Sequence, residues 1–124
     1  MDEKKISASL EDYLKTMFQL HQTDITIRIS DISKCMEVSK ASASHAVTLL
    51  AEMGYVDHFR YGPILLTHKG VAVAEGLLAK YNTIKFFLER ILGVGEVLAG
   101  LEACAIEHNI HEDTLQRMSA LLEA

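Results

Sequence analysis

Apolar residues recur along most of this chain at the three- and four-residue spacing of helices that bury one face. Residues 7–21 follow this spacing and offer Ser7 or Ser9 as a cap, which predicts a first helix. Ser30 can cap a short helix over 30–37, and Ser39 can cap a longer one over 40–54 that ends at Gly54. Two helices joined by a tight turn, the second opening with small polar residues, are typical of a helix-turn-helix.

Two short β-prone runs follow, at 55–59 and 64–66, separated by a turn sequence at 60–63 that contains Gly and Pro. This pattern predicts a β-hairpin, or wing. Thr67 can cap a long helix that runs to about residue 92 and ends at Gly93, and two further helices are expected over 94–109 and 111–122. The predicted fold is mainly α, with a winged helix-turn-helix domain over 1–70 and a helical domain over 71–124.

The composition fits a folded globular chain, because 49% of its 124 residues are hydrophobic and 23% are charged. No apolar stretch approaches the roughly 20 residues of a membrane span, and the acidic start does not resemble a signal peptide, so we expect a cytoplasmic protein. We expect no structural disulfide, and Cys35 is interpreted as a small buried residue. The net charge is −5, yet residues 1–70 hold eight Lys and Arg against nine Asp and Glu, and residues 71–124 hold four against eight. Any contact with DNA is therefore expected in the first domain.

The helix over 40–54 has the composition of a DNA-reading helix. Val47 and Leu50 lie at core spacing, and the residues expected on the outer side of the first turns are Ser39, Lys40, Ser42, Ala43 and His45. Ser and Lys suit phosphate or base-edge hydrogen bonds, and Ala can touch a thymine methyl group. At the wing tip, Arg60 and Tyr61 are expected to reach the neighbouring DNA backbone. The alternative is a helical module that binds another protein.

A second group of residues suggests metal chemistry. Cys104, Glu107 and His108 stand at i, i+3 and i+4, which places a thiolate, a carboxylate and an imidazole on one helix face. The plain alternative is a buried thiol beside a solvated charge pair. Cys104 could also be an oxidation switch in a winged-helix regulator that binds no metal. A Cys104–His108 nucleophile pair of an enzyme is disfavoured, because the sequence has neither a Gly-rich oxyanion loop nor a pocket-forming sheet.

Over essentially its whole length the sequence resembles the DtxR/MntR family of metal-dependent repressors. The resemblance rests on LEDYLKTMFQL, SDISKCMEVSKASASHAVTLLAEMGYV, LTHKGVAVAEGLL and ACAIEHNIHEDTLQRM, in this order. It implies a transcriptional repressor of metal homeostasis that is not an enzyme, with a winged-helix domain for an operator in double-stranded DNA and a helical domain that forms a homodimer and carries the metal. It also implies that Asp12, in the first helix, completes the metal site of Cys104, Glu107 and His108.

The sequence departs from the family at other ligand positions. Lys15 stands where manganese sensors have a Glu, Tyr81 where the family has a metal-binding His, and Lys85 near a carboxylate position of the iron-type ancillary site. We therefore expect one divalent metal per subunit. Cys104 matches the iron-type pattern, and a thiolate favours Fe(II), Co(II), Ni(II) or Zn(II) over Mn(II), so Fe(II) is the first choice and all five are possible. Larger members continue into an SH3-like third domain, from which we expect no ligands.

Overall fold

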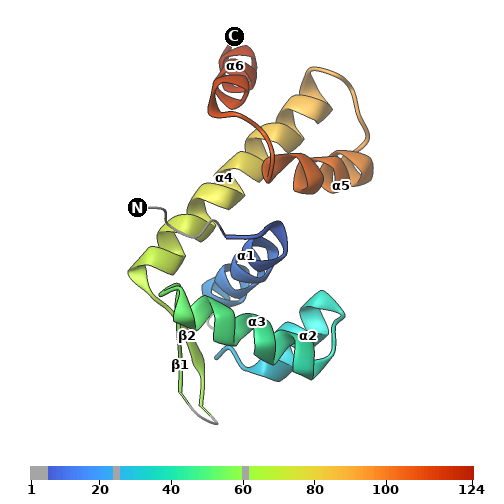
Figure 1. Cartoon of the computed structure of the whole chain (residues 1–124). Helices are drawn as coiled ribbons and strands as arrows, with labels where there is room; N and C mark the ends of the chain where they lie inside the picture. Colours follow the sequence, from blue (N-terminus) through green and yellow to red (C-terminus); the bar gives the residue numbers. More distant parts are fainter. Residues whose placement is uncertain (1–5, 24–25, 60–61) are drawn as a thin grey trace. The chain divides into compact units, whose positions relative to one another are not determined.

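A computed structural model describes residues 6–23, 26–59 and 62–124, and it divides the chain into two compact units with the boundary between Glu75 and Gly76. The helices and strands follow the predicted order (Figure 1): α1 (Ala8–Gln22), α2 (Ile29–Met36), α3 (Lys40–Glu52), β1 (Val56–His58), β2 (Ile64–Leu66), α4 (His68–Arg90), α5 (Glu96–Glu107) and α6 (Glu112–Glu123). The predicted fold class, mainly helical with a small antiparallel sheet, is confirmed. Within the described ranges, no helix is both long enough and apolar enough to cross a membrane.

Three of the predicted caps form. The Ser7 hydroxyl accepts the Leu10 N–H at 3.2 Å ahead of α1, and the Ser39 hydroxyl accepts the Ser42 N–H at 3.0 Å ahead of α3. Ahead of α4, the Thr67 hydroxyl accepts the N–H of Gly70 at 3.1 Å. Each bond satisfies a backbone donor that has no partner within its own helix.

The start of α2 differs from the prediction. This helix begins at Ile29, and the Asp31 carboxylate accepts the Arg28 N–H at 3.0 Å, so the expectation that Ser30 caps it is wrong. The reason is that an Asp at the third helical position can bond back to the residue before the helix. Glu37 then ends α2 in the left-handed conformation, with φ of 55°, and begins the turn to α3.

The predicted wing is present as an antiparallel pair in which Val56 faces Leu66, Asp57 faces Leu65 and His58 faces Ile64. The Ile64 N–H donates to the Ile27 carbonyl at 2.8 Å, which joins the wing to the segment before α2. Figure 1 shows the two strands running side by side away from the helices of this unit. The wing residues Arg60 and Tyr61 lie outside the described residues.

The first unit packs α1, α2, α3 and the two strands around one apolar core, in which α3 contacts α1, α2 and β1. Its fully buried side chains come from each of these elements and include Met17, Ile32, Val47, Leu50 and Ile64. Val47 and Leu50 of α3 are buried in this core, as their spacing in the sequence predicts. The opposite side of α3 is exposed to solvent.

The second unit is built on the later part of α4, against which α5 packs (Figure 1). Ile84 and Leu88 of α4 are buried together with Ala99 and Ala103 of α5. Small residues on α5 permit a close approach, since a Cβ placed on Gly100 would lie only 3.1 Å from the Tyr81 Oη atom. The core is completed by partly buried side chains, including Ile106, Ile110, Leu115 and Met118. The long helix ends at Arg90, two residues earlier than expected, and α5 spans less than the predicted 94–109.

Candidate metal centre and nucleic-acid interface

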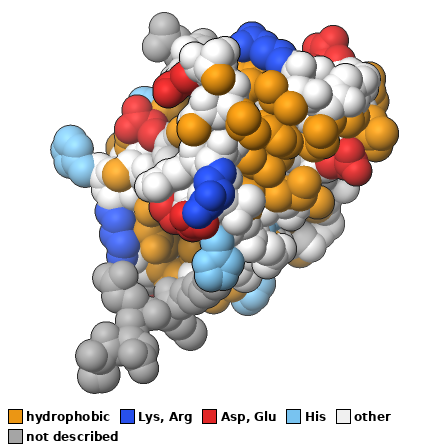
Figure 2. Space-filling view, turned by 90° about the horizontal axis from the view of Figure 1, so that it is seen from above, with side chains coloured by type: hydrophobic (Ala, Val, Ile, Leu, Met, Phe, Trp, Pro, Cys, Tyr) orange, Lys and Arg blue, Asp and Glu red, His pale blue; other side chains and the backbone are white. Residues whose placement is uncertain are grey.

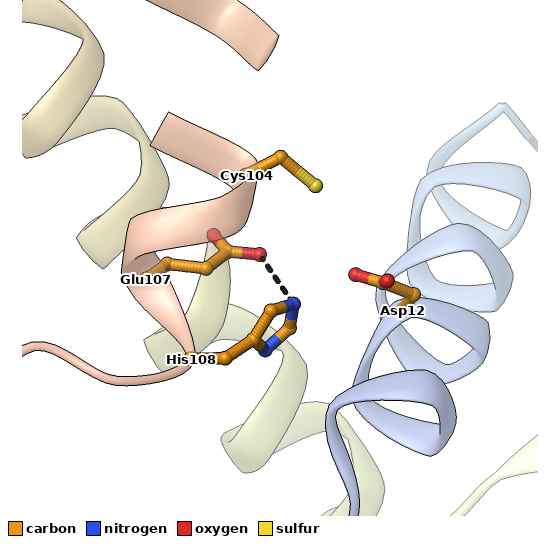
Figure 3. Close-up of side chains that lie close together, drawn as sticks. All are labelled: Asp12, Cys104, Glu107 and His108. Carbon is orange, nitrogen blue, oxygen red and sulfur yellow. Dashed lines mark ion pairs between the residues drawn. The ribbon is translucent and has the colours of Figure 1, made fainter. Parts of the chain in front are cut away.

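The last turn of α5 brings together the three residues that the sequence placed on one helix face. The three residues each offer one ligand atom, and these atoms lie within 4.8 Å of one another: the sulfur of Cys104, a carboxylate oxygen of Glu107 and an imidazole nitrogen of His108. Cys104 and Glu107 belong to α5, whereas His108 is its C-cap and keeps helical backbone angles, which preserves the shared face. Figure 3 shows the three side chains projecting from this turn, with Glu107 and His108 pointing toward each other.

The geometry of this group fits a transition metal. The Nε2 atom of His108 lies 3.6 Å from Oε1 of Glu107, which is long for a hydrogen bond. In a tetrahedral site with metal–ligand bonds of about 2.0 to 2.3 Å, neighbouring donor atoms are about 3.3 to 3.7 Å apart. Glu107 is buried, and Cys104 and His108 are half-buried. A buried carboxylate is tolerated when it is paired with a cation or bound to a metal. Glu107 and its two neighbours are therefore suitable metal ligands.

Asp12 is the residue that the family resemblance adds to this group. It lies on α1, in the first unit, and is half-buried. Its carboxylate can offer an oxygen ligand to a metal. Sequence spacing alone does not identify Asp12, because more than ninety residues separate it from Cys104.

Tyr81 and Lys85, the two departures on α4, lie beside Gly100 of α5. The Lys85 Nζ atom is 3.3 Å from a Glu89 carboxylate oxygen and 4.0 Å from one of Glu96. An ammonium group has no lone pair to offer a metal, and here it is paired with two carboxylates.

The exposed face of α3 lacks one residue that the sequence interpretation placed there and extends further along the helix than that interpretation implied. Ser39, Lys40, Ser42 and His45 are exposed as expected, but Ala43 is fully buried. Its expected contact with a thymine methyl group is therefore wrong: Ala43 lies one turn before Ala46 and Val47, on the buried stripe that continues to Leu50.

The same periodicity identifies the residues that the sequence interpretation missed. Ala41, Ser44 and Thr48 are exposed and fall on the side opposite the buried stripe. The Thr48 hydroxyl donates to the Ser44 carbonyl at 3.0 Å, so Thr48 presents mainly its methyl group. Counting three and four residues along the helix from the core positions in the sequence identifies this exposed face.

Cys35, expected to be buried, is exposed on α2, so that expectation is also wrong.

The second unit exposes many large hydrophobic side chains. Figure 2 shows hydrophobic side chains gathered over a broad part of the surface in that view. The exposed fraction reaches 80% for Val97 and 67% for Leu101, and the other exposed large hydrophobic residues of this unit are Phe86, Ile91, Leu92, Leu98 and Leu121. Large exposed apolar patches are typical of protein–protein interfaces.

Comparison with known proteins agrees with both parts of this description. Residues 5–64 match the model of the iron dependent repressor N-terminal DNA binding domain, and residues 67–124 match that of the iron dependent repressor metal binding and dimerisation domain. An uncharacterized HTH-type transcriptional regulator of Methanocaldococcus jannaschii is 32% identical over 119 residues, which cover 95% of each chain. The HTH-type transcriptional regulator MntR of Shouchella clausii is 30% identical, over 93% of this chain and 80% of its own.

Among solved structures, that of the manganese regulator SloR matches with a TM-score of 0.82 and 30% identity, over 92% of this chain. The present chain spans about half of that longer one, 53% of its length. Two family models together span nearly all of the sequence, and a relative is 32% identical over 95% of each chain. The chain belongs to the DtxR/MntR family of metal-dependent transcriptional repressors, a family of regulators and not of enzymes.

Proposed function

We propose that this protein is a repressor of metal-homeostasis genes whose DNA binding is activated by one divalent transition metal per subunit. The observation that carries the proposal is the convergence of a cysteine sulfur, a carboxylate and an imidazole at the end of α5. A bound metal would supply coordinate bonds that hold these side chains in a single arrangement. Cys104, Glu107 and His108 are the proposed ligands from the second unit.

Asp12 is the proposed fourth ligand. Its support is the family resemblance, the hard oxygen that it would add to the donor set, and its half-buried position on α1. Because Asp12 belongs to the unit that carries α3, its coordination would link metal binding to DNA binding. A metal shifts a conformational equilibrium only by its difference in affinity between two states, so loss of Asp12 should reduce the metal's effect on DNA more than its binding.

Fe(II) is the proposed physiological metal, because a thiolate ligand favours it over Mn(II). SloR, whose structure is similar, is a manganese regulator, which makes Mn(II) the main competitor. Co(II), Ni(II) and Zn(II) also suit the donor set and are expected to activate in vitro. A single metal is proposed because Tyr81 and the Lys85 ammonium stand where further ligands would be needed.

The exposed face of α3 is the proposed reading surface. We place Ala41, Ser44, His45 and Thr48 toward the bases of a major groove, and Ser39, Lys40 and Ser42 at its edge near phosphates. Arg60 and Tyr61 of the wing remain proposed contacts to the neighbouring backbone. The partner is double-stranded DNA, bound by a homodimer that pairs the exposed apolar surface of the second unit with its copy, because half-sites about 34 Å apart require two reading helices.

The test combines metal analysis with a DNA-binding titration. The protein is purified without oxygen, its metal content is measured by mass spectrometry, and binding to genomic duplex fragments is followed by fluorescence anisotropy with Fe(II), Mn(II), Zn(II) or a chelator. We expect one metal per chain and metal-dependent binding. Protein that binds DNA equally well in chelator and without stoichiometric metal would instead favour Cys104 as an oxidation switch.

Ligand variants make the test specific. Alanine at Cys104, Glu107 or His108 should weaken metal binding and abolish metal-dependent DNA binding while the fold is kept. Glu102→Gln is the matched control, because Glu102 is an exposed carboxylate on the same helix two residues before Cys104. Asp12→Ala should keep partial metal binding and lose stimulation of DNA binding. Wild-type metal affinity in all three alanine variants would refute the site, and full stimulation in Asp12→Ala would refute the link.

A further inference from the structure

Hydrogen bonds within the first unit join the end of α3 to the start of α4. The Lys69 ammonium donates to the Met53 carbonyl at 3.0 Å, and the Thr67 hydroxyl donates to the Gly54 carbonyl at 2.7 Å. The last carbonyls of a helix have no partner inside it, and a cation at that end also interacts favourably with the helix dipole. Lys69 therefore acts as a cap for α3, supplied by another helix.

Two further observations fix this contact in place. The Lys69 ammonium also lies over the Tyr55 ring, 4.5 Å from its centroid, so the cation is held between a carbonyl and an aromatic face. The next residue is a glycine because the backbone passes very close: a Cβ on Gly70 would lie 2.1 Å from the Tyr55 carbonyl oxygen. The Thr67 N–H donates to that same Tyr55 carbonyl at 3.1 Å.

A lysine in a DNA-reading unit is ordinarily interpreted as a phosphate contact. Here the ammonium already has a carbonyl and a ring as partners, at the end of α3 opposite to Ser39 and Lys40. We propose that Lys69 is a positioning residue: it fixes the C-terminal end of α3 on α4 and so sets the orientation in which α3 meets the groove. This inference rests on the proposed function of α3 as the reading helix.

The salt dependence of DNA binding distinguishes a positioning role for Lys69 from a phosphate contact by Lys40. Loss of a phosphate contact weakens specific and non-specific binding alike and lowers the salt slope by about one. Loss of a positioning contact weakens binding to the operator, here by about five- to tenfold, and leaves non-specific binding and the salt slope unchanged. We expect the second pattern for Lys69→Met and the first for Lys40→Met. Lys69→Arg should restore operator binding, because a guanidinium can donate to the same carbonyl and stack on Tyr55.

Amide hydrogen exchange tests the contact without DNA. The Tyr55 N–H donates to the Leu50 carbonyl and the Gly54 N–H to that of Ala51, and both should exchange about tenfold faster in Lys69→Met than in the wild type. Unchanged exchange, or a reduced salt slope in Lys69→Met, would overturn the proposal. Faster exchange in a protein that binds no duplex with any metal would support the contact and overturn the proposed function instead, so the two failures are distinguishable.

Discussion

Two glycines on α4 should respond in opposite ways to the same substitution. Gly70 lies in the first turn against Tyr55, where a new Cβ would meet the carbonyl oxygen at 2.1 Å, against the 3.4 Å at which ordinary contact begins. Gly76 lies six residues further along the same helix, and among the described residues nothing comes within 4 Å of a Cβ built on it. Alanine at Gly70 therefore requires a backbone movement of about 1.3 Å, whereas alanine at Gly76 requires none.

The size of each effect follows from these contacts. An extra methyl group forced against a rigid neighbour costs about 1 to 3 kcal/mol of folding free energy. Movement of α4 away from Tyr55 also weakens the hydrogen bonds of Thr67 and Lys69, each of which contributes about 1 kcal/mol. The higher helix propensity of Ala returns about 1 kcal/mol. Gly70→Ala should therefore lower the free energy of unfolding by about 2 to 4 kcal/mol. Gly76→Ala, with only the propensity term, should raise it by about 0.5 to 1 kcal/mol.

Urea unfolding followed by circular dichroism measures both variants. The measurements are made in a chelator, because a metal that binds only the folded state would add its own stabilisation. Thermal unfolding should agree, at about 3 to 5 °C for each kcal/mol in a chain of this size. If Gly70→Ala and Gly76→Ala have the same free energy of unfolding, the close approach of α4 to Tyr55 is refuted as a determinant of stability.

Three other changes follow from single features. Ser39→Ala removes the cap of α3 and should cost about 1 kcal/mol in urea unfolding, whereas Ser30→Ala, inside α2, should cost less; equal losses would contradict the capping role. Glu37→Gly relieves a left-handed residue and should raise the same free energy by about 1 kcal/mol, and a decrease would show that φ at 37 is not costly. Leu101→Asp should convert a dimer into a monomer by light scattering, whereas Leu65→Asp, on the wing, should not; a dimeric Leu101→Asp would place the interface elsewhere.

Most of the fold could be predicted because local signals and the buried face agree. Ser7, Ser39 and Thr67 cap helices as their positions predict, and the turn sequence before Pro63 separates the two strands. The predicted start of α2 was wrong because only Ser30 was considered as its cap, whereas the carboxylate of the next residue, Asp31, bonds to the backbone before the helix. Ends of helices depend on such single contacts, which composition does not decide.

The candidate site, too, could be predicted only in part from the sequence. The face shared by Cys104, Glu107 and His108 follows from helix periodicity alone. Ala43 was misplaced because the outer side was assigned from its place in the first turns, although its four-residue spacing to Val47 puts it on the buried stripe. The contact between Lys69 and Met53 joins residues sixteen apart through a turn of the chain, and no local pattern in the sequence indicates it.

The boundary between the two units falls inside a helix, between Glu75 and Gly76 of α4, and no loop separates them there. Proteases cut most readily at exposed loops, so digestion of the folded protein should not release the two units as intact fragments. An expression fragment cut at this boundary would end in a helix deprived of its following turns, with carbonyls that have lost their partners. Fragments meant to fold separately should therefore share α4, the first extending to Arg90 and the second starting at Thr67.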